Sequence, residues 1–242
     1  MATTCPALRF VERDPHGLAG DSSFWELYGA SFERTLREPS GALIEGVRSG
    51  KVLAFAAEDD GRTLGLAAVH LLEAPATSLL LYLAVVPELR GQRIGSTLLT
   101  HALAVARERQ ELLDREPRGW AVQVDVPELA PTLGERERRR RILLFFRSQG
   151  AKPLPCAYVR PPVRGGTPAA ARLLHAPDGS LPLRREEVQA LLQSIYFEKF
   201  AGMNGVDRRL LLSLLGPAPA GAPGVVLPGA SARVPPWPSQ RD

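Results

Sequence analysis

The chain has 242 residues, of which 45% are hydrophobic and 23% charged, and this composition excludes a wholly disordered protein. Thirty basic and 26 acidic residues give a formal net charge of +4, a small excess that says little about the ligand. Two cysteines, Cys5 and Cys156, cannot build a disulfide framework or a four-thiolate zinc site. We interpret both as free thiols in a reducing cytosol and expect a cytoplasmic protein.

Metal and membrane signatures are missing from the sequence. The four histidines form no His-x-x-x-His or His-Glu-x-x-His pair, so we expect no metal cofactor. The N-terminus has no basic region followed by an apolar core, so no signal peptide is expected. The longest apolar stretch, 79–87, is far shorter than the ~20 residues that span a bilayer, so we expect no membrane span.

Strand and helix patterns alternate from residue 8 to about residue 215. Asp21 or Ser22 is a plausible N-cap for the first helix, and the sequence Asp59-Asp60-Gly61-Arg62 indicates a hairpin between two apolar runs. In the first half we predict strands at 8–12, 52–58, 63–72 and 79–86, and helices at 22–32 and 42–48.

The second half continues the alternation, with Gly150 closing one helix. Here we predict helices at 95–113, 135–148, 186–200 and 207–215, and strands at 121–126, 157–160 and 171–175. Hairpin-linked strands followed by strand-helix-strand crossovers predict a mixed α/β sheet with helices on both faces. We expect one domain over 1–215 and, because seven prolines and four glycines lie in 216–242, a flexible tail there.

One segment, 79–109, carries most of the chemistry. A buried strand ends at Pro87, and the loop Arg90-Gly91-Gln92-Arg93-Ile94-Gly95-Ser96 leads into a helix. The first amides of a helix have no partner within it, the helix dipole adds positive charge there, and glycines permit close approach to the backbone. The segment therefore indicates a phosphate or pyrophosphate site, or, as the plainer alternative, a turn that merely caps a helix.

The run from Val85 to Ser96 resembles motif A of the GNAT superfamily of N-acetyltransferases, written Gln/Arg-x-x-Gly-x-Gly/Ala. Arg90 matches its first position and Gly95 its last, whereas Arg93 replaces the middle glycine. The Phe145–Ala151 segment is similar to motif B, and the order of strands and helices resembles the family order over roughly residues 8–200.

This resemblance implies a mostly antiparallel sheet that is splayed at the motif A strand and binds acetyl-CoA as co-substrate, in a cytoplasmic bacterial transferase. An amide near Val85 would polarise the thioester carbonyl. The residues implied to contact pantetheine and the thioester are Leu83, Ala84 and Val85; those implied at the pyrophosphate are Arg90, Gly91, Gln92, Arg93, Ile94, Gly95 and Ser96.

The implied reaction is direct attack of a primary amine on the thioester, which needs a base for the ammonium and an acid for the leaving thiolate. Phe146 stands where many relatives have the tyrosine acid, so Tyr158 is our candidate acid, with Tyr196 and Cys156 as alternatives. Asp125 is the first candidate base, followed by Glu73 and His70.

Other interpretations stay open. Phe146 also suits a non-catalytic acyl-CoA-binding or sensing module. The arginine-rich run 135–141 could contact the CoA 3′-phosphate or an acidic partner, or simply be a solvated helix start. A nucleic-acid partner is not expected, because few aromatic residues lie between the basic ones. The superfamily often dimerises, and the apolar face of 186–200 could form a homodimer. The acceptor amine is not identified by the sequence.

Overall fold

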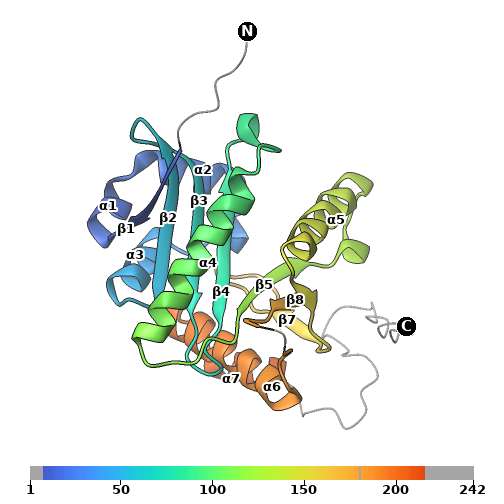
Figure 1. Cartoon of the computed structure of the whole chain (residues 1–242). Coiled ribbons are helices and arrows are strands. Elements are labelled where there is room, and N and C mark those ends of the chain that lie inside the picture. The colour runs from blue at the N-terminus through green and yellow to red at the C-terminus, as the bar shows by residue number, and fades with distance from the viewer. Residues whose placement is uncertain (1–7, 180, 216–242) are drawn as a thin grey trace.

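The computed structural model describes residues 8–179 and 181–215, so the proline- and glycine-rich segment 216–242 and Cys5 lie outside the described residues. The chain forms one eight-stranded sheet in the order β1-β2-β3-β4-β5-β8-β6, with β7 paired to β8 (Figure 1). The strands are β1 Arg9–Arg13, β2 Val52–Asp59, β3 Arg62–Leu71, β4 Ser78–Val85, β5 Trp120–Asp125, β6 Lys152–Pro153, β7 Tyr158–Arg160 and β8 Ala169–Ala176.

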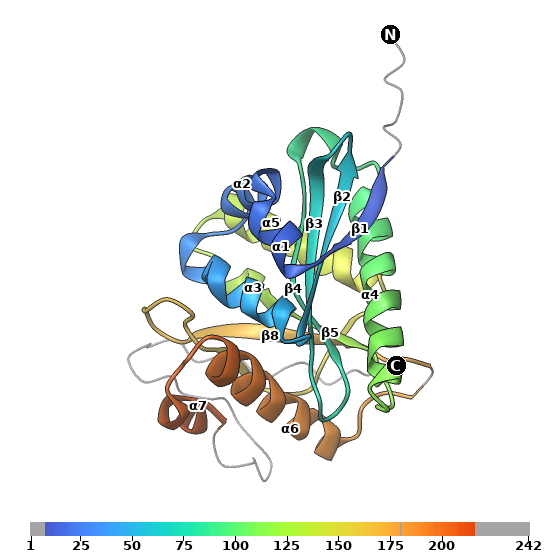
Figure 2. The ribbon, with the colours of Figure 1, turned by 90° about the vertical axis from the view of Figure 1, so that its left-hand side faces the viewer.

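Helices cover both faces of this sheet, as predicted. Figure 2 shows α1, α2 and α3 on one face of the strands β1 to β4 and α4 on the other. The helices are α1 Pro15–Gly20, α2 Ser22–Ser31, α3 Ser40–Arg48, α4 Ile94–Leu112, α5 Leu133–Ser148, α6 Arg185–Ser194, the π-helical continuation Ile195–Met203, and α7 Arg208–Leu215. Short 3₁₀ turns occupy Arg34–Leu36, Pro87–Leu89 and Pro127–Leu129.

Three apolar clusters hold these layers together. Alternate residues of β2 and β3, such as Phe55 and Val69, face α4 and α5, whereas their neighbours, such as Ala54 and Ala68, face α1 to α3. The third cluster joins β5, β7 and β8 to α6 and α7. Near-continuous apolar sequence in β2 and β3 is thus the consequence of burial on both sides.

The sheet is antiparallel throughout except where β4 pairs with β5 in parallel. This confirms the predicted mixed, mostly antiparallel sheet. Two elements were not predicted: α1, whose N-cap Asp14 accepts hydrogen bonds from the amides of His16 and Gly17, and the two-residue β6.

The helix predicted over 186–200 divides into α6 and the π-helical Ile195–Met203. Its apolar stripe, including Val188, Leu191 and Ile195, is buried in the third cluster of this chain. That face is therefore not free to form a homodimer, because the chain's own sheet covers it.

Candidate functional site

The strands β4 and β5 separate after a short paired stretch. They pair only from Ser78 opposite Trp120 to Leu80 opposite Val122, although β4 continues to Val85 and β5 to Asp125. A register shift between β3 and β4 falls at Leu80–Tyr82, just where the separation begins. We call this divergence the splay; its closed end lies at Ser78 and its open end at Val85 (Figure 1).

The splay leaves part of β4 unpaired on one side. The Val86 amide donates to the Leu64 carbonyl at 2.9 Å, so by the alternation of an antiparallel ladder Tyr82 and Ala84 also face β3. The peptide groups of Leu83 and Val85 then face β5, where no described strand pairs with them beyond Leu80. An extended amide-bearing ligand fits this edge in the way that an added strand would.

The loop after β4 presents a second set of free amides. Gly91 has φ +82° and Arg93, the residue before α4, has φ +63°, so two left-handed residues turn the chain into the helix. Within the described residues no side chain caps this helix start; the Ser96 and Thr97 hydroxyls donate back to the Arg93 carbonyl instead. The first amides of α4 therefore remain available to an anion.

Two contacts join this loop to the open end of β4. Arg90 donates through Nε to the Val85 carbonyl at 3.1 Å. A Cβ on Gly95 would lie 3.5 Å from Val85 Cγ2, so the first turn of α4 sits directly against the end of the strand. The strand edge and the anion-binding amides are thus neighbours, which suits a ligand with an amide-bearing arm and a phosphate group.

Asp125 and Tyr158 lie on strands across the splay from β4, where both pair with Ala171 of β8 from opposite sides. Asp125 ends β5, is half-buried, and accepts from Arg160 Nη2 through Oδ1 at 2.6 Å. Tyr158, on β7, is 3% exposed and donates its hydroxyl to Gln123 Oε1 at 2.8 Å. Burial raises the pKa of Tyr158 well above its usual value, so its hydroxyl keeps its proton near neutral pH.

Glu73 and His70 lie elsewhere. Glu73 follows β3 beside the closed end of the splay, where it pairs with Arg115 at 3.2 Å. His70 is fully buried in β3 and neither ring nitrogen has a hydrogen-bond partner. Burial lowers the pKa of His70 to about 3, with smaller contributions from Lys199 and Lys51. Neither side chain is brought to the open end.

Phe146 and Tyr196 are buried in apolar clusters, as Tyr158 is, and Cys156 is half-buried against the third cluster. Phe146 packs against Trp120 with ring centroids 6.2 Å apart, among the residues shared by α4 and α5. Tyr196 donates its hydroxyl to the Val159 carbonyl at 2.7 Å, and burial raises its pKa. Burial raises the pKa of Cys156 to about 12, so its thiol is protonated near neutral pH.

A hollow of about 290 Å³, which no sequence pattern indicates, lies on the α2 side of the sheet. Its residues come from α2, from the connection to α3 with the first residue of α3, and from the distant connection between β7 and β8, and these segments share no periodicity. They are Trp25, Tyr28, Arg34, Arg37, Glu38, Ser40 and Arg164. We call this the arginine hollow.

The arginine hollow is linked to β4. The Glu38 amide donates to the Tyr82 hydroxyl at 3.0 Å, and the rings of Tyr28 and Tyr82 meet edge to face at 4.8 Å. Tyr82 precedes Leu83, the first residue of the unpaired edge. The hollow thus lies directly behind the open part of β4.

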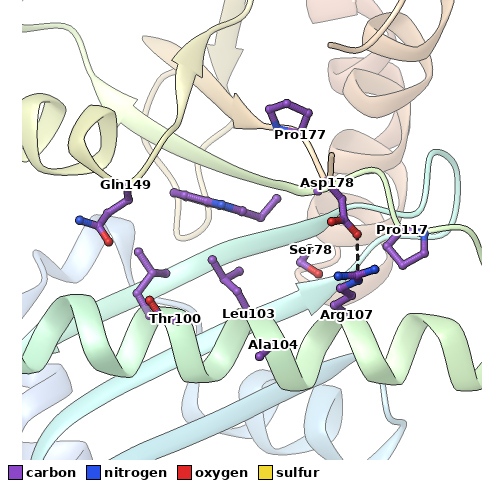
Figure 3. A pocket seen from close by; sticks show the side chains of 12 residues that line it. Ser78, Thr100, Leu103, Ala104, Arg107, Pro117, Gln149, Pro177 and Asp178 are labelled. Atoms are coloured by element: carbon purple, nitrogen blue, oxygen red, sulfur yellow. Dashed lines mark ion pairs between the residues drawn. The ribbon is translucent and has the colours of Figure 1, made fainter. Parts of the chain in front are cut away.

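A second hollow, of about 280 Å³, lies beside the closed end of the splay (Figure 3). Ser78 and Trp120, which form the first β4–β5 pair, line it together with Leu103 of α4, and the Arg107–Asp178 ion pair of 2.9 Å borders it. Its place at the closed end separates it from the unpaired residues of β4.

The arginine-rich start of α5 is partly neutralised. Glu135 accepts from Arg138 and Arg139, each at 2.7 Å at the shortest, and these bonds lower the pKa of Glu135 to about 2.

Over residues 8–179 and 181–215, no group of three or more His, Cys, Asp or Glu side chains could hold a metal ion. In the same ranges no helix is both long and apolar enough to cross a membrane.

Comparison with known proteins agrees with this geometry. Residues 21–117 match the model of the acetyltransferase (GNAT) family. Residues 21–117 are thus similar to the GNAT family, and the chain shares its fold with GNAT proteins of known structure. No curated protein is a significant match to the sequence.

Solved structures share the fold at low sequence identity. A Bacteroides thetaiotaomicron protein assigned to the GNAT acetyltransferases is 19% identical with a TM-score of 0.59, over 82% of this chain and 99% of its own. Arabidopsis thaliana NAA60, solved with acetyl-CoA, is 14% identical with a TM-score of 0.51, over 72% and 100%. An aminoglycoside 6′-N-acetyltransferase solved with coenzyme A is 16% identical with a TM-score of 0.51, over 72% and 99%.

Proposed function

We propose that the protein is an acetyl-CoA-dependent N-acetyltransferase that acts on a primary amine in the cytoplasm. The observation that carries this proposal is the unpaired edge of β4 next to the uncapped start of α4, inside the segment that matches the GNAT family. The edge supplies peptide groups for the pantetheine amides and the helix start supplies amides for the pyrophosphate.

Four groups of the chain then have separate tasks. The peptide groups of Leu83 align the pantetheine arm, and the Val85 N–H donates toward the thioester oxygen as its negative charge grows. The amides of 91–96 hold the pyrophosphate, with Arg90 and Arg93 adding positive charge. The acetyl group enters as the donor thioester, and the acceptor nitrogen attacks its carbonyl carbon.

Asp125 is the proposed base. It stands at the open end of β5, and because Arg160 engages Oδ1, Oδ2 is the oxygen left to accept the ammonium proton directly or through water. Tyr158 is the proposed acid, since it holds its proton; delivery to the thiolate requires its hydroxyl to turn from Gln123. Glu73 is the weaker choice of base because it stands at the closed end.

Paired variants test the base. We expect Asp125→Asn to lower kcat by about 100-fold, the typical contribution of a positioned base, while leaving the affinity for acetyl-CoA unchanged. Glu73→Gln is the matched control and is expected to keep wild-type kcat. If instead Glu73→Gln lowers kcat and Asp125→Asn does not, Glu73 is the base. If neither variant loses activity, neither carboxylate acts as the base.

A second candidate function is a non-catalytic acyl-CoA-binding or sensing module. The burial of Phe146, at the position of the usual tyrosine acid, favours it. The module and the enzyme differ in one measurement: release of free thiol from acetyl-CoA that depends on an added amine. Amine-dependent release that Gly95→Glu abolishes would exclude the module.

A further inference from the structure

The arginine hollow joins the two sides of the splay. Trp25, Tyr28 and Glu38 belong to the segments that cover β4, whereas Arg164 belongs to the connection between β7 and β8, on the far side. A second contact bridges the same two sides, because Arg138 of α5 lies 4.0 Å from Glu33, next to Arg34. A molecule in this hollow therefore touches both arms that enclose the open end of β4.

Three arginines that have no ion-pair partner within the described part of the chain gather there. Among residues 8–179 and 181–215, Arg34, Arg37 and Arg164 form no ion pair. Arg37 Nη1 lies 3.2 Å from the position that a Cβ on Gly29 would take, so its guanidinium rests against α2. Burial and Glu38 raise the pKa of Tyr28, but Arg37 and Arg164 both act to lower it, which places their charges close to the same hydroxyl. Three neighbouring guanidinium groups repel one another unless an anion joins them.

A buried carboxylate also lines the hollow. Glu38 is 1% exposed, and its Oε1 accepts from Lys199 Nζ at 2.8 Å and from Asn204 Nδ2 at 3.4 Å. Its Oε2 has no hydrogen-bond partner, and a buried carboxylate oxygen without one is costly. Glu38 is also the residue whose amide reaches Tyr82 of β4. The buried Glu38 carboxylate therefore places negative charge behind the wall of the hollow, near the unpaired edge.

We propose that the acceptor is a small amine that also carries an anionic group, a carboxylate or a phosphate, bound by Arg34, Arg37 and Arg164 while its amino group lies toward Glu38 and β4. This inference rests on the proposed acetyltransferase function. Guanidinium forks bind carboxylates and phosphates in two-point contacts, and Trp25 and Tyr28 provide a flat wall for the carbon skeleton.

Matched amines test the proposal with the full-length protein saturated with coenzyme A. Calorimetry compares 4-aminobutyrate with 4-aminobutanamide, α-amino acids with their carboxamides, and phosphoethanolamine with ethanolamine. We expect the acidic member of at least one pair to bind about tenfold or more tightly, as charge-assisted pairs do. The carboxylate and phosphate pairs distinguish the two sources of the anion. The same pairs are then compared by kcat/KM.

Variants assign the preference to the hollow. Arg37→Gln and Arg164→Gln are expected to remove most of the tenfold preference, and Arg37→Lys to restore part of it. Arg147→Gln is the matched control, because Arg147 is exposed in the last turn of α5, and it is expected to keep the preference. Thermal unfolding of each variant verifies that it folds.

The outcomes separate the two proposals. If coenzyme A binds but acidic and neutral amines bind equally, or the arginine variants keep the preference, the inference is overturned and the acetyltransferase proposal stands. If coenzyme A and acetyl-CoA do not bind to the wild-type protein at millimolar concentration, the acetyltransferase proposal itself fails.

Discussion

Arg93 takes a backbone conformation, φ +63°, that costs residues with a side chain about 1 kcal/mol or more, whereas glycine adopts it freely. This explains how the chain departs from motif A while keeping the loop: the arginine occupies the left-handed position of the missing glycine. We expect Arg93→Gly to stabilise the protein by up to about 1 kcal/mol and Arg93→Val to destabilise it, because a β-branched residue suits this region least.

Both variants remove the same charge, so their difference isolates the backbone effect. Urea unfolding and acetyl-CoA calorimetry measure it, and we expect Arg93→Val to bind acetyl-CoA more weakly than Arg93→Gly. Equal stability and equal affinity in the two variants would contradict the role assigned to this conformation.

His70 makes stability depend on pH. Burial lowers the pKa of His70 from 6.5 to about 3, so below pH 6.5 the unfolded chain binds a proton that the folded chain does not. The stability contribution is present above pH 6.5 and is lost progressively down to about pH 3. His70→Leu fills similar space and removes the titration.

Chemical denaturation at two pH values measures this effect. Between pH 7.5 and pH 5.5 we expect the wild-type protein to lose about 1.4 kcal/mol more stability than His70→Leu. Parallel stability profiles of the two proteins would show that His70 is not buried in a neutral form.

At the scale of single elements, the start of α2 depends on Asp21. Its side chain accepts from the Phe24 amide at 2.8 Å, from the Ser23 and Thr63 hydroxyls, each at 2.7 Å, and from Arg13 at 2.9 Å. Burial acts to raise the pKa of Asp21, but these hydrogen bonds outweigh it and the pKa is lowered. One side chain thus caps a helix and ties it to β1 and β3.

Asp21→Ala is therefore expected to destabilise the protein by about 2–3 kcal/mol, and Asp21→Asn, which keeps the cap but loses the charge, by about half as much. Thermal unfolding checks the order of the two variants. If both variants lose the same amount of stability, the ion pair with Arg13 rather than the cap accounts for the contribution of Asp21.

Element prediction succeeded where local chemistry decides and failed where it does not. The hairpin at Asp59–Arg62 and the cap at Asp21 are local signals, and both are found. The segment of α1 contains Pro15, Gly17 and Gly20, which favour loops; its cap at Asp14 and the burial of Leu18 make it a helix.

At the scale of the whole molecule, the strand, loop and helix that form the anion-binding segment, 79–96, could be inferred because they follow directly in sequence. The arginine hollow could not, because Arg37 and Arg164 are far apart in sequence and only the splay brings their segments together. The length of β4–β5 pairing is likewise a tertiary property, since β5 pairs with β8 over its whole length but with β4 only up to Val122.

The proposed acetyltransferase activity depends on acetyl-CoA binding at the open end of the splay. Isothermal titration of acetyl-CoA into the wild-type protein, Gly95→Glu and Gly41→Glu tests this directly. Glutamate at Gly95 places negative charge in the first turn of α4 against Val85, whereas Gly41 lies in the first turn of α3 on the other face, with open space around it. We expect saturable binding to the wild-type protein and Gly41→Glu and at least about tenfold weaker binding to Gly95→Glu. Absence of binding to the wild-type protein at millimolar acetyl-CoA, or equal binding to all three, would contradict the account.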